Sequence, residues 1–203
     1  MEHIINQITL VGTLGDIPEF SHENHGRQFY RFLLHVPRLS GTVDSLPVIA
    51  EDRLLRTANL TVSQTYKITG QIRSHNYRAD GTRRLLIFVF ATLIEPDDGE
   101  PVNDVVLQGP LCREPNYRRT PLGREICDIM LAVPRSFRRA DYLPCILLGR
   151  TAQEASRCHT RDTIRICGRL QSRNYTKLTE DGPVEKTAYE ISALSAIILE
   201  EIL

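Results

Sequence analysis

Asp44-Ser45-Leu46-Pro47-Val48-Ile49 and Asp141-Tyr142-Leu143-Pro144-Cys145-Ile146 are two versions of one hexapeptide, 97 positions apart (44 to 141) in a chain of 203 residues. Aspartate, leucine, proline and isoleucine recur at the same places in both versions. The same spacing relates Val36-Pro37-Arg38 to Val133-Pro134-Arg135, a few residues before each hexapeptide. A constant spacing shared by separate motifs indicates that the chain is a tandem duplication.

The duplication extends to both sides of the hexapeptide. Towards the N-terminus, the residues that recur at the same spacing are Asn6, Gly12 and Leu14, which return as Asn103, Gly109 and Leu111. Towards the C-terminus the spacing slips by one, as small loop insertions would produce: Gly70 and Asn76-Tyr77 return as Gly168 and Asn174-Tyr175. The acidic segment 96–101 is bracketed by prolines, as is typical of a linker. We therefore expect a first domain over 1–95, a linker over 96–101 and a second domain over 102–203.

Apolar alternation and β-branched content predict five strands in each copy. The predicted ranges are 5–14, 27–37, 46–50, 65–77 and 84–94 in the first copy, and 102–111, 124–133, 143–148, 163–175 and 186–199 in the second. One short helix fits between the third and fourth strands of each copy, at 51–60 and 151–158. Asp80-Gly81 and Asp181-Gly182 predict the hairpin turns between strands four and five. This order is that of the oligonucleotide-binding (OB) fold, so the expected class is all-β with two tandem five-stranded OB-fold barrels.

Composition is that of a globular protein, with 41% hydrophobic residues and a formal net charge of zero. Zero net charge argues against nucleic-acid binding by bulk electrostatics alone. Only Lys67, Lys177 and Lys186 are lysines, so guanidinium groups, which both pair with phosphate and stack on bases, carry most of the positive charge. No apolar stretch is long enough to cross a bilayer, and residues 1–10 lack the features of a signal peptide. We expect a cytoplasmic protein without membrane association.

The sequence gives no indication of a metal site, a cofactor or an enzyme. The five cysteines include no C-x-x-C pair and are expected to be reduced thiols buried in strands. His22 and His25 lie in a polar stretch that we interpret as a solvated loop. Ser136 and Ser172 lack the setting of a nucleophile, no glycine-rich loop introduces a helix, and no carboxylate pair suggests acid–base catalysis.

The second copy resembles the bacterial single-stranded DNA-binding protein family in three stretches. They are Asn103-x-Val105-x-Leu107-x-Gly109-x-Leu111, the run from Asp141 to Ala152, and Gly168-Arg169-Leu170-Gln171-Ser172-Arg173-Asn174-Tyr175. Proteins similar to primosomal replication protein N, in the same superfamily, are related possibilities. The resemblance implies a bacterial, nucleoid-associated protein that protects or organises single-stranded DNA in replication, recombination or repair. It also implies a homodimer that presents four OB folds.

Three departures from the family pattern shape the expectation further. The chain contains no tryptophan, on which the family commonly stacks bases. The third strand of the first copy has no aromatic residue and ends near Glu51 and Asp52, so we expect this copy to be a degenerate binder. The last predicted strand runs almost to 200–203 with no acidic tail behind it, so we do not expect recruitment of partners through such a tail.

Binding of single strands requires aromatic faces for the bases and cations for the phosphates. The second copy offers candidates between and within its second and third strands: Arg135, Phe137, Arg138, Arg139 and Tyr142. Further candidates are Arg118 and Arg119 in its first loop, and Arg173 and Tyr175 at the end of its fourth strand. The first copy offers Tyr77 and Arg78 at the matching place, and Phe29, which strand parity puts on the face opposite to the core position Phe32.

Each candidate also has a structural explanation. The aromatic residues near Arg135 could close the mouth of the barrel, and Tyr77 and Tyr175 could be structural. The alternative function is an accessory factor of replication that binds proteins through its OB folds and binds nucleic acid weakly or not at all. A positive groove joining Arg118, Arg135, Arg138 and Arg173 would favour binding of strands, whereas pairing of arginines with Glu114, Asp128 and Asp141 would favour the alternative. RNA in place of DNA stays open, because stacking surfaces accept either sugar.

Overall fold

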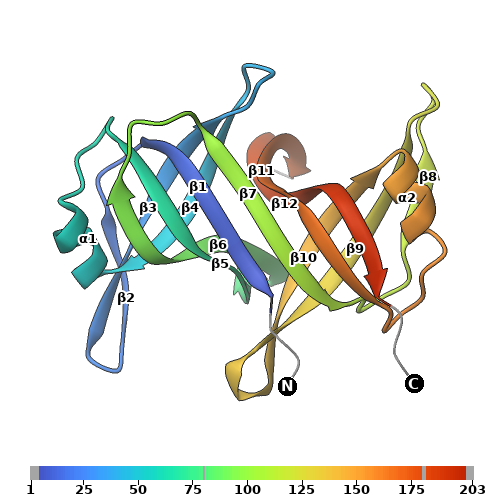
Figure 1. Ribbon diagram of the computed structural model, residues 1–203, viewed down its shortest axis with the longest axis horizontal. Helices are drawn as coiled ribbons and strands as arrows, with labels where there is room; N and C mark the ends of the chain where they lie inside the picture. The colour runs from blue at the N-terminus through green and yellow to red at the C-terminus, as the bar shows by residue number, and fades with distance from the viewer. Residues whose placement is uncertain (1–4, 80, 180–181, 200–203) are drawn as a thin grey trace.

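The computed structural model describes residues 5–79, 81–179 and 182–199 (Figure 1). The elements of the first copy are β1 (Asn6–Leu14), β2 (Glu19–Asn24), β3 (Arg27–Pro37), β4 (Val43–Glu51), α1 (Asp52–Ala58), β5 (Thr65–Ala79) and β6 (Thr82–Pro96). Those of the second are β7 (Val102–Pro110), β8 (Asn116–Arg119), β9 (Glu125–Arg135), the 3₁₀ turn η1 (Ser136–Arg138), β10 (Arg139–Leu148), α2 (Arg150–Ala155), β11 (Thr163–Thr179) and β12 (Gly182–Leu199). All ten predicted strands and both predicted helices are confirmed.

Each copy forms an OB-fold barrel, which confirms the expected fold class. In the first copy β1 pairs with both β5 and β3, so the order β1-β3-β4-β6-β5 returns to its start. In the second copy the order is β7-β11-β12-β10-β9, and an isolated bridge between Leu111 and Leu131 joins the end of β7 to β9. The helix of each copy follows the third of the five barrel strands, β4 or β10.

Two short strands depart from the prediction. β2 pairs with β3 and β8 pairs with β9, at the two outer edges of the sheet. Both segments were expected to be loops, because almost all of their residues are exposed on both faces and give no apolar alternation. The interpretation of His22 as part of a solvated loop is therefore wrong: it lies on β2, and only His25 lies in the turn.

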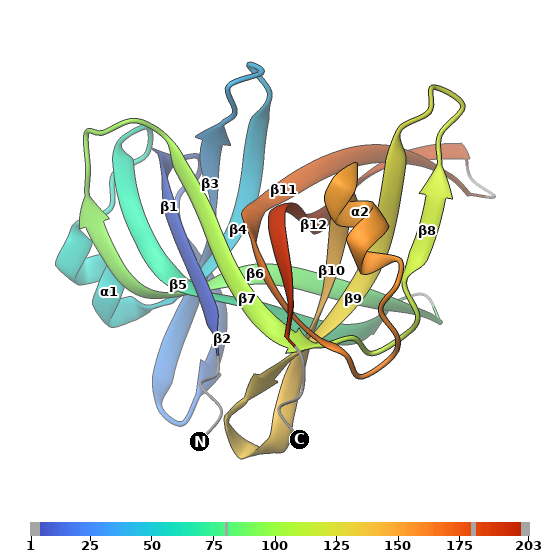
Figure 2. The same cartoon turned by 45° about the vertical axis from the view of Figure 1, so that its right-hand side comes forward.

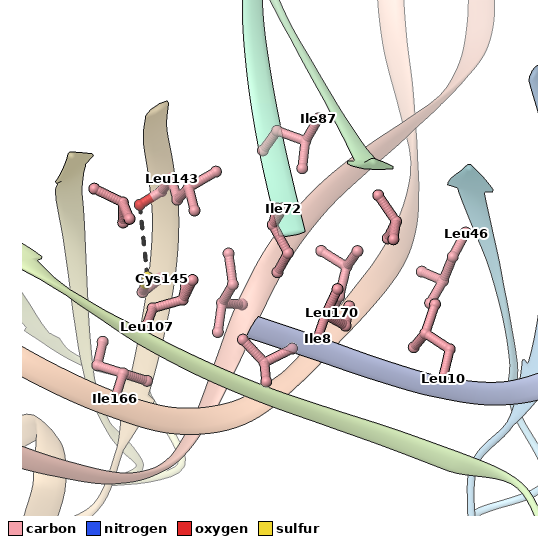
Figure 3. Packing of buried hydrophobic residues seen from close by; sticks show 14 of the residues in the cluster. Ile8, Leu10, Leu46, Ile72, Ile87, Leu107, Leu143, Cys145, Ile166 and Leu170 are labelled. Atoms are coloured by element: carbon pink, nitrogen blue, oxygen red, sulfur yellow. Dashed lines mark hydrogen bonds between the residues drawn. The ribbon is translucent and has the colours of Figure 1, made fainter. Parts of the chain in front are cut away.

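The two barrels share one twelve-stranded sheet, because β1 pairs antiparallel with β7 from Asn6 opposite Leu107 to Val11 opposite Val102. Figures 1 and 2 both show β1 and β7 side by side at the centre of the molecule. Buried apolar side chains of both copies form one cluster, which includes Ile8 and Leu10 of β1 and Leu107 of β7 (Figure 3). The barrels are thus packed as one body.

Buried aspartates connect each barrel to the other. Asp44 on β4 accepts hydrogen bonds from the backbone N–H (2.7 Å) and hydroxyl (3.1 Å) of Ser172 on β11. Asp141 on β10 accepts one from the backbone N–H of Ser74 on β5 (2.8 Å). Both aspartates are completely buried, and they are the residues that open the two repeated hexapeptides. Their repetition therefore reflects a two-fold-like contact between the copies.

Gly70 and Gly168 recur for a steric reason. A β-carbon at Gly168 would lie 2.2 Å from the carbonyl oxygen of Ser192, and one at Gly70 would lie 2.2 Å from that of Phe90. Both glycines stand at a register shift between the two strands of the long hairpin. The close approach of the partner strand at this bulge excludes any side chain.

The expectation that all five cysteines are buried in strands is wrong in part. All are free; Cys127, Cys145 and Cys158 are buried, Cys167 is half-buried and Cys112 is exposed. Cys112 and Cys158 also lie outside strands, in connections where the sequence shows no strand pattern. Among the described residues, no three or more His, Cys, Asp or Glu side chains form a group that could hold a metal ion.

Some expectations lie outside the described residues. Asp80 and Asp181 of the two predicted turns are among them, whereas Gly81 and Gly182 both have positive φ. Residues 200–203, on which the expectation of a missing tail rests, lie outside as well. Within the described ranges, neither helix is long and apolar enough to span a membrane.

Candidate nucleic-acid interface

The turn between β9 and β10 presents an aromatic ring to solvent. Phe137 is 93% exposed, and both Phe137 (φ 62°) and Arg138 (φ 55°) adopt the left-handed backbone region that non-glycine residues rarely occupy. Strained backbone of this kind is concentrated at functional sites. Arg138 and Arg139 are exposed beside the ring, and no carboxylate within the described ranges is paired with either.

Tyr142 lies on the outer face of β10, just after this turn. Alternation along the strand buries Leu143 and Cys145 in the core and leaves Tyr142 43% exposed. Its backbone N–H donates to the hydroxyl of Ser74 on the other copy (2.8 Å), which fixes the position of the residue. We name Arg135, Phe137, Arg138, Arg139 and Tyr142 the turn patch.

Arg118 and Arg119 lie on β8 rather than in a loop, which corrects the expectation. The strand places Arg118 opposite Ile126, and its guanidinium pairs with Asp128 at 2.9 Å. Hydrogen bonding to Asp128 raises the pKa of Arg118. Arg119 donates to the carbonyl of Gly123 at 3.4 Å. Both side chains remain exposed, but Arg118 already has a counter-charge.

The arginines proposed for a continuous positive groove are mostly paired. Arg135 binds Asp141 at 3.3 Å, Arg173 lies 3.7 Å from Glu190, and Arg118 binds Asp128. Glu114 instead accepts hydrogen bonds from Thr160, which lowers its pKa. Three of the four arginines of the expected groove thus already have a counter-charge, whereas Arg138 has no paired carboxylate among the described residues.

A second candidate surface joins residues that the sequence analysis named separately in the two copies. Tyr77 of β5 and Tyr175 of β11 line the same cleft of about 540 Å³, each with 39% of its surface exposed. The half-buried Tyr189 and the cationic Arg84, Lys177 and Lys186 line it too, so it combines three tyrosines with three cationic side chains. We name this the tyrosine cleft. Tyr77 and Tyr175 are 98 positions apart (77 to 175), and the association of the two copies brings their hairpins together. Arg173 lies 5.9 Å from the ring of Tyr175, and Arg78 is exposed beside Tyr77.

Phe29 lies on the face of β3 opposite to Phe32, as parity predicts, but only 8% of it is exposed. His22 of β2 stacks flat against it, with ring centroids 4.9 Å apart and an interplanar angle of 10°. Phe90 of β6 lies 5.9 Å away on another side. Sequence parity could not show that β2 folds over this ring, since β2 itself was not predicted.

Known proteins resemble the chain in sequence and in fold. The profile of the single-strand binding protein family matches residues 102–198. Single-stranded DNA-binding protein B of Bacillus subtilis (strain 168) is 36% identical over 80 residues, which cover 36% of this chain and 71% of that protein. Single-stranded DNA-binding protein 1 of Staphylococcus aureus (strain COL) is 38% identical over 81 residues, which cover 36% of this chain and 48% of that protein. The chain thus spans about half the length of the Staphylococcus relative.

A solved structure extends the similarity to both copies. The single-stranded DNA-binding protein of Thermus aquaticus matches 97% of this chain and 94% of its own, with a TM-score of 0.79 at 23% identity. At 23% identity this similarity shows a shared fold alone, and the shared fold includes both barrels of the chain.

Proposed function

The chain belongs to the single-strand binding protein family, and we propose that it binds single-stranded DNA without catalysis, holding strands during replication, recombination or repair. The observation that carries the proposal is the exposed, strained Phe137 with Arg138, Arg139 and Tyr142 around it. An apolar ring held in water at 93% exposure gains stability once a base stacks on it. The proposal places the protein at the bacterial nucleoid.

In this proposal bases stack on Phe137 and Tyr142 while Arg138 and Arg139 contact the neighbouring phosphates. A stacked base contributes about 1–3 kcal/mol and depends little on sequence, because every base has a flat π-face. The tyrosine cleft supplies a second contact through Tyr77 and Tyr175, with Lys177 and Lys186 near the backbone. Arg78, Arg118, Arg119 and Arg173 act on the strand as it passes between these surfaces.

The test is fluorescence anisotropy of a labelled dT oligomer at low and moderate salt, with duplex DNA and an RNA oligomer as comparisons. Phe137→Ala and Tyr142→Ala should each weaken binding roughly 5- to 150-fold, the equivalent of one lost stacked base. Leu39→Ala is the matched control, since Leu39 is fully exposed in the corresponding turn of the first copy and should leave affinity unchanged. An absence of binding at low salt would refute the proposal.

We further propose that two chains associate and present four barrels. Exposed apolar side chains on β6 and β12, Leu93 (44%), Leu194 (68%) and Ile197 (57%), support it, because burial against a second copy would remove them from water. Light scattering should then give twice the mass of one chain, and a monodisperse monomer would contradict the association.

A further inference from the structure

An aromatic cleft lies on the outer side of the first copy, the copy that the sequence predicts to be a degenerate binder. Its volume is about 250 Å³, and Phe29 of β3, Phe88 and Phe90 of β6, and Ile49 of β4 line it. His22 and Asn24 of β2 complete its lining and are exposed. We name it the phenylalanine cleft. Phe88 and Phe90 are half-buried, so their rings keep part of their surface in the cleft.

The geometry of the rings suits a flat heteroaromatic group. His22 already stacks on Phe29 at 4.9 Å and 10°, the parallel arrangement in which a base lies on an aromatic side chain. Phe90, 5.9 Å from Phe29 and tilted by 39°, offers a second ring at an angle to the first. The cleft therefore holds one planar ring of the chain itself and has room for another beside it.

Two arginines make the same cleft favourable for an anion. Arg73 and Arg135 both line it, and both bind the carboxylate of Asp141, at 3.1 and 3.3 Å. Two guanidinium groups share one buried carboxylate, which leaves one positive charge in excess. Burial, followed by the charge of Arg135, lowers the pKa of Arg73, as expected where positive charge is incompletely balanced. Arg73 also lies 5.9 Å from the ring of Phe90.

The described residues at the matching positions of the second copy do not repeat this aromatic lining. Ile49 opposite Phe90 corresponds to Ile146 opposite Ser192, so serine replaces one phenylalanine. Two residues earlier on the same face, Glu190 stands in place of Phe88, accepts a hydrogen bond from Gln171 and pairs with Arg173. The aromatic lining is thus particular to the first copy and does not follow from the shared fold.

We propose that the phenylalanine cleft binds one base of a single strand of DNA, with an adjacent phosphate at Arg73 and Arg135. The inference rests on the proposed function and extends it to the first copy. At about 250 Å³ the cleft is smaller than the roughly 300–1,000 Å³ of pockets for drug-sized ligands, so it accepts a single base and not a run of bases. Arg135 belongs to both the cleft and the turn patch, so a strand can pass from Phe137 to Phe90 along one arginine.

The absence of tryptophan from the chain allows a direct test, because any introduced tryptophan is the sole indole. Three proteins are prepared, Phe90→Trp, His22→Trp and Phe137→Trp, and each is titrated with a dT oligomer of about 35 nucleotides, enough for two OB folds. Anisotropy of the labelled oligomer is recorded on the same samples. Stacking of thymine in the cleft should quench Phe90→Trp and the exposed His22→Trp in step with binding.

The outcomes separate this inference from the function on which it rests. Quenching of Phe137→Trp without quenching of either cleft variant overturns the inference but leaves the proposed function standing. The cleft would then not bind a base of the strand. Absence of oligomer binding by the unaltered protein refutes both. As a second measurement, Phe90→Ala should weaken binding roughly 5- to 150-fold. Phe20→Ala is its control, since Phe20 is 55% exposed on β2 outside the cleft and should change nothing; equal affinities of the two variants overturn the inference.

Discussion

Replacing Asp44 with alanine removes one of the two buried aspartates that connect the barrels. The carboxylate is completely buried and accepts hydrogen bonds from the N–H of Ser172 at 2.7 Å and from Nε of Arg38 at 2.7 Å. Hydrogen bonding to Asp44 raises the pKa of Arg38. Arginine is already charged at neutral pH, so Asp44→Ala leaves its guanidinium without a counter-charge. Removing one member of a buried ion pair costs about 3–5 kcal/mol. This cost of about 3–5 kcal/mol already includes the lost hydrogen bonds of Ser172, because the energies of interactions that share one side chain are not additive.

Urea unfolding followed by circular dichroism measures this loss. With a slope of about 1–3 kcal/mol per molar, a loss of about 3–5 kcal/mol moves the midpoint down by about 1 M or more. Glu19→Ala is the matched control: Glu19 pairs with Arg31 at 3.0 Å, but both side chains are about two-thirds exposed (68% and 67%), and such pairs contribute at most about 1 kcal/mol. If the two variants lose equal stability, burial of Asp44 does not secure the contact between the barrels, and the reasoning fails.

Three further outcomes follow from steric and thiol environments. Gly168→Ala should lower the free energy of unfolding by about 1–3 kcal/mol, because its β-carbon would meet the Ser192 carbonyl at 2.2 Å; an unchanged melting temperature would show that the bulge can open. Cys112, which is exposed, should react with an aromatic disulfide reagent in the native protein while Cys127 and Cys145 do not, and rapid labelling of Cys145 would contradict its burial. Burial raises the pKa of Cys127 to about 11, above the roughly 8.5 of an unfolded thiol. Between these values the unfolded chain loses the thiol proton and the folded chain keeps it. The contribution of Cys127 to the free energy of unfolding is therefore complete below about pH 8.5 and is lost as the pH rises towards about 11. Between about pH 8.5 and about pH 11 the melting temperature should fall by less in Cys127→Ala than in the unaltered protein. An equal fall in both proteins would show that Cys127 does not cause the loss of stability.

The repeat allowed the fold to be predicted because strand patterns and turn residues appear twice, each copy supporting the other. Gly70 alone could be incidental, but its recurrence as Gly168 indicates that the fold requires glycine at this place. β2 and β8 were missed because an edge strand with both faces in water needs no apolar alternation. Position within the sheet, not local composition, makes these segments strands.

The candidate interface could be predicted only where it is local. The turn patch comes from one continuous stretch, 135–142, and its residues do lie near one another. The tyrosine cleft and the phenylalanine cleft combine residues from both copies, and no local sequence pattern indicates that these segments meet. The ion pairs of Arg118 and Arg173 likewise depend on partners that face them across strands.

The pairing of β1 with β7 has a consequence for how the barrels stay together. Residues 97–101 join β6 of the first barrel to β7 of the second, so the association of the two barrels is intramolecular and proceeds at an effective concentration on the order of millimolar. Dilution that would separate two single-barrel chains leaves this pair intact. The tether also means that each barrel is encoded separately, so a substitution changes one of them alone. A chain of this design can keep one barrel close to the family pattern while the other carries a different surface, such as the phenylalanine cleft. A symmetric pair of identical chains could not carry such a surface on one side only.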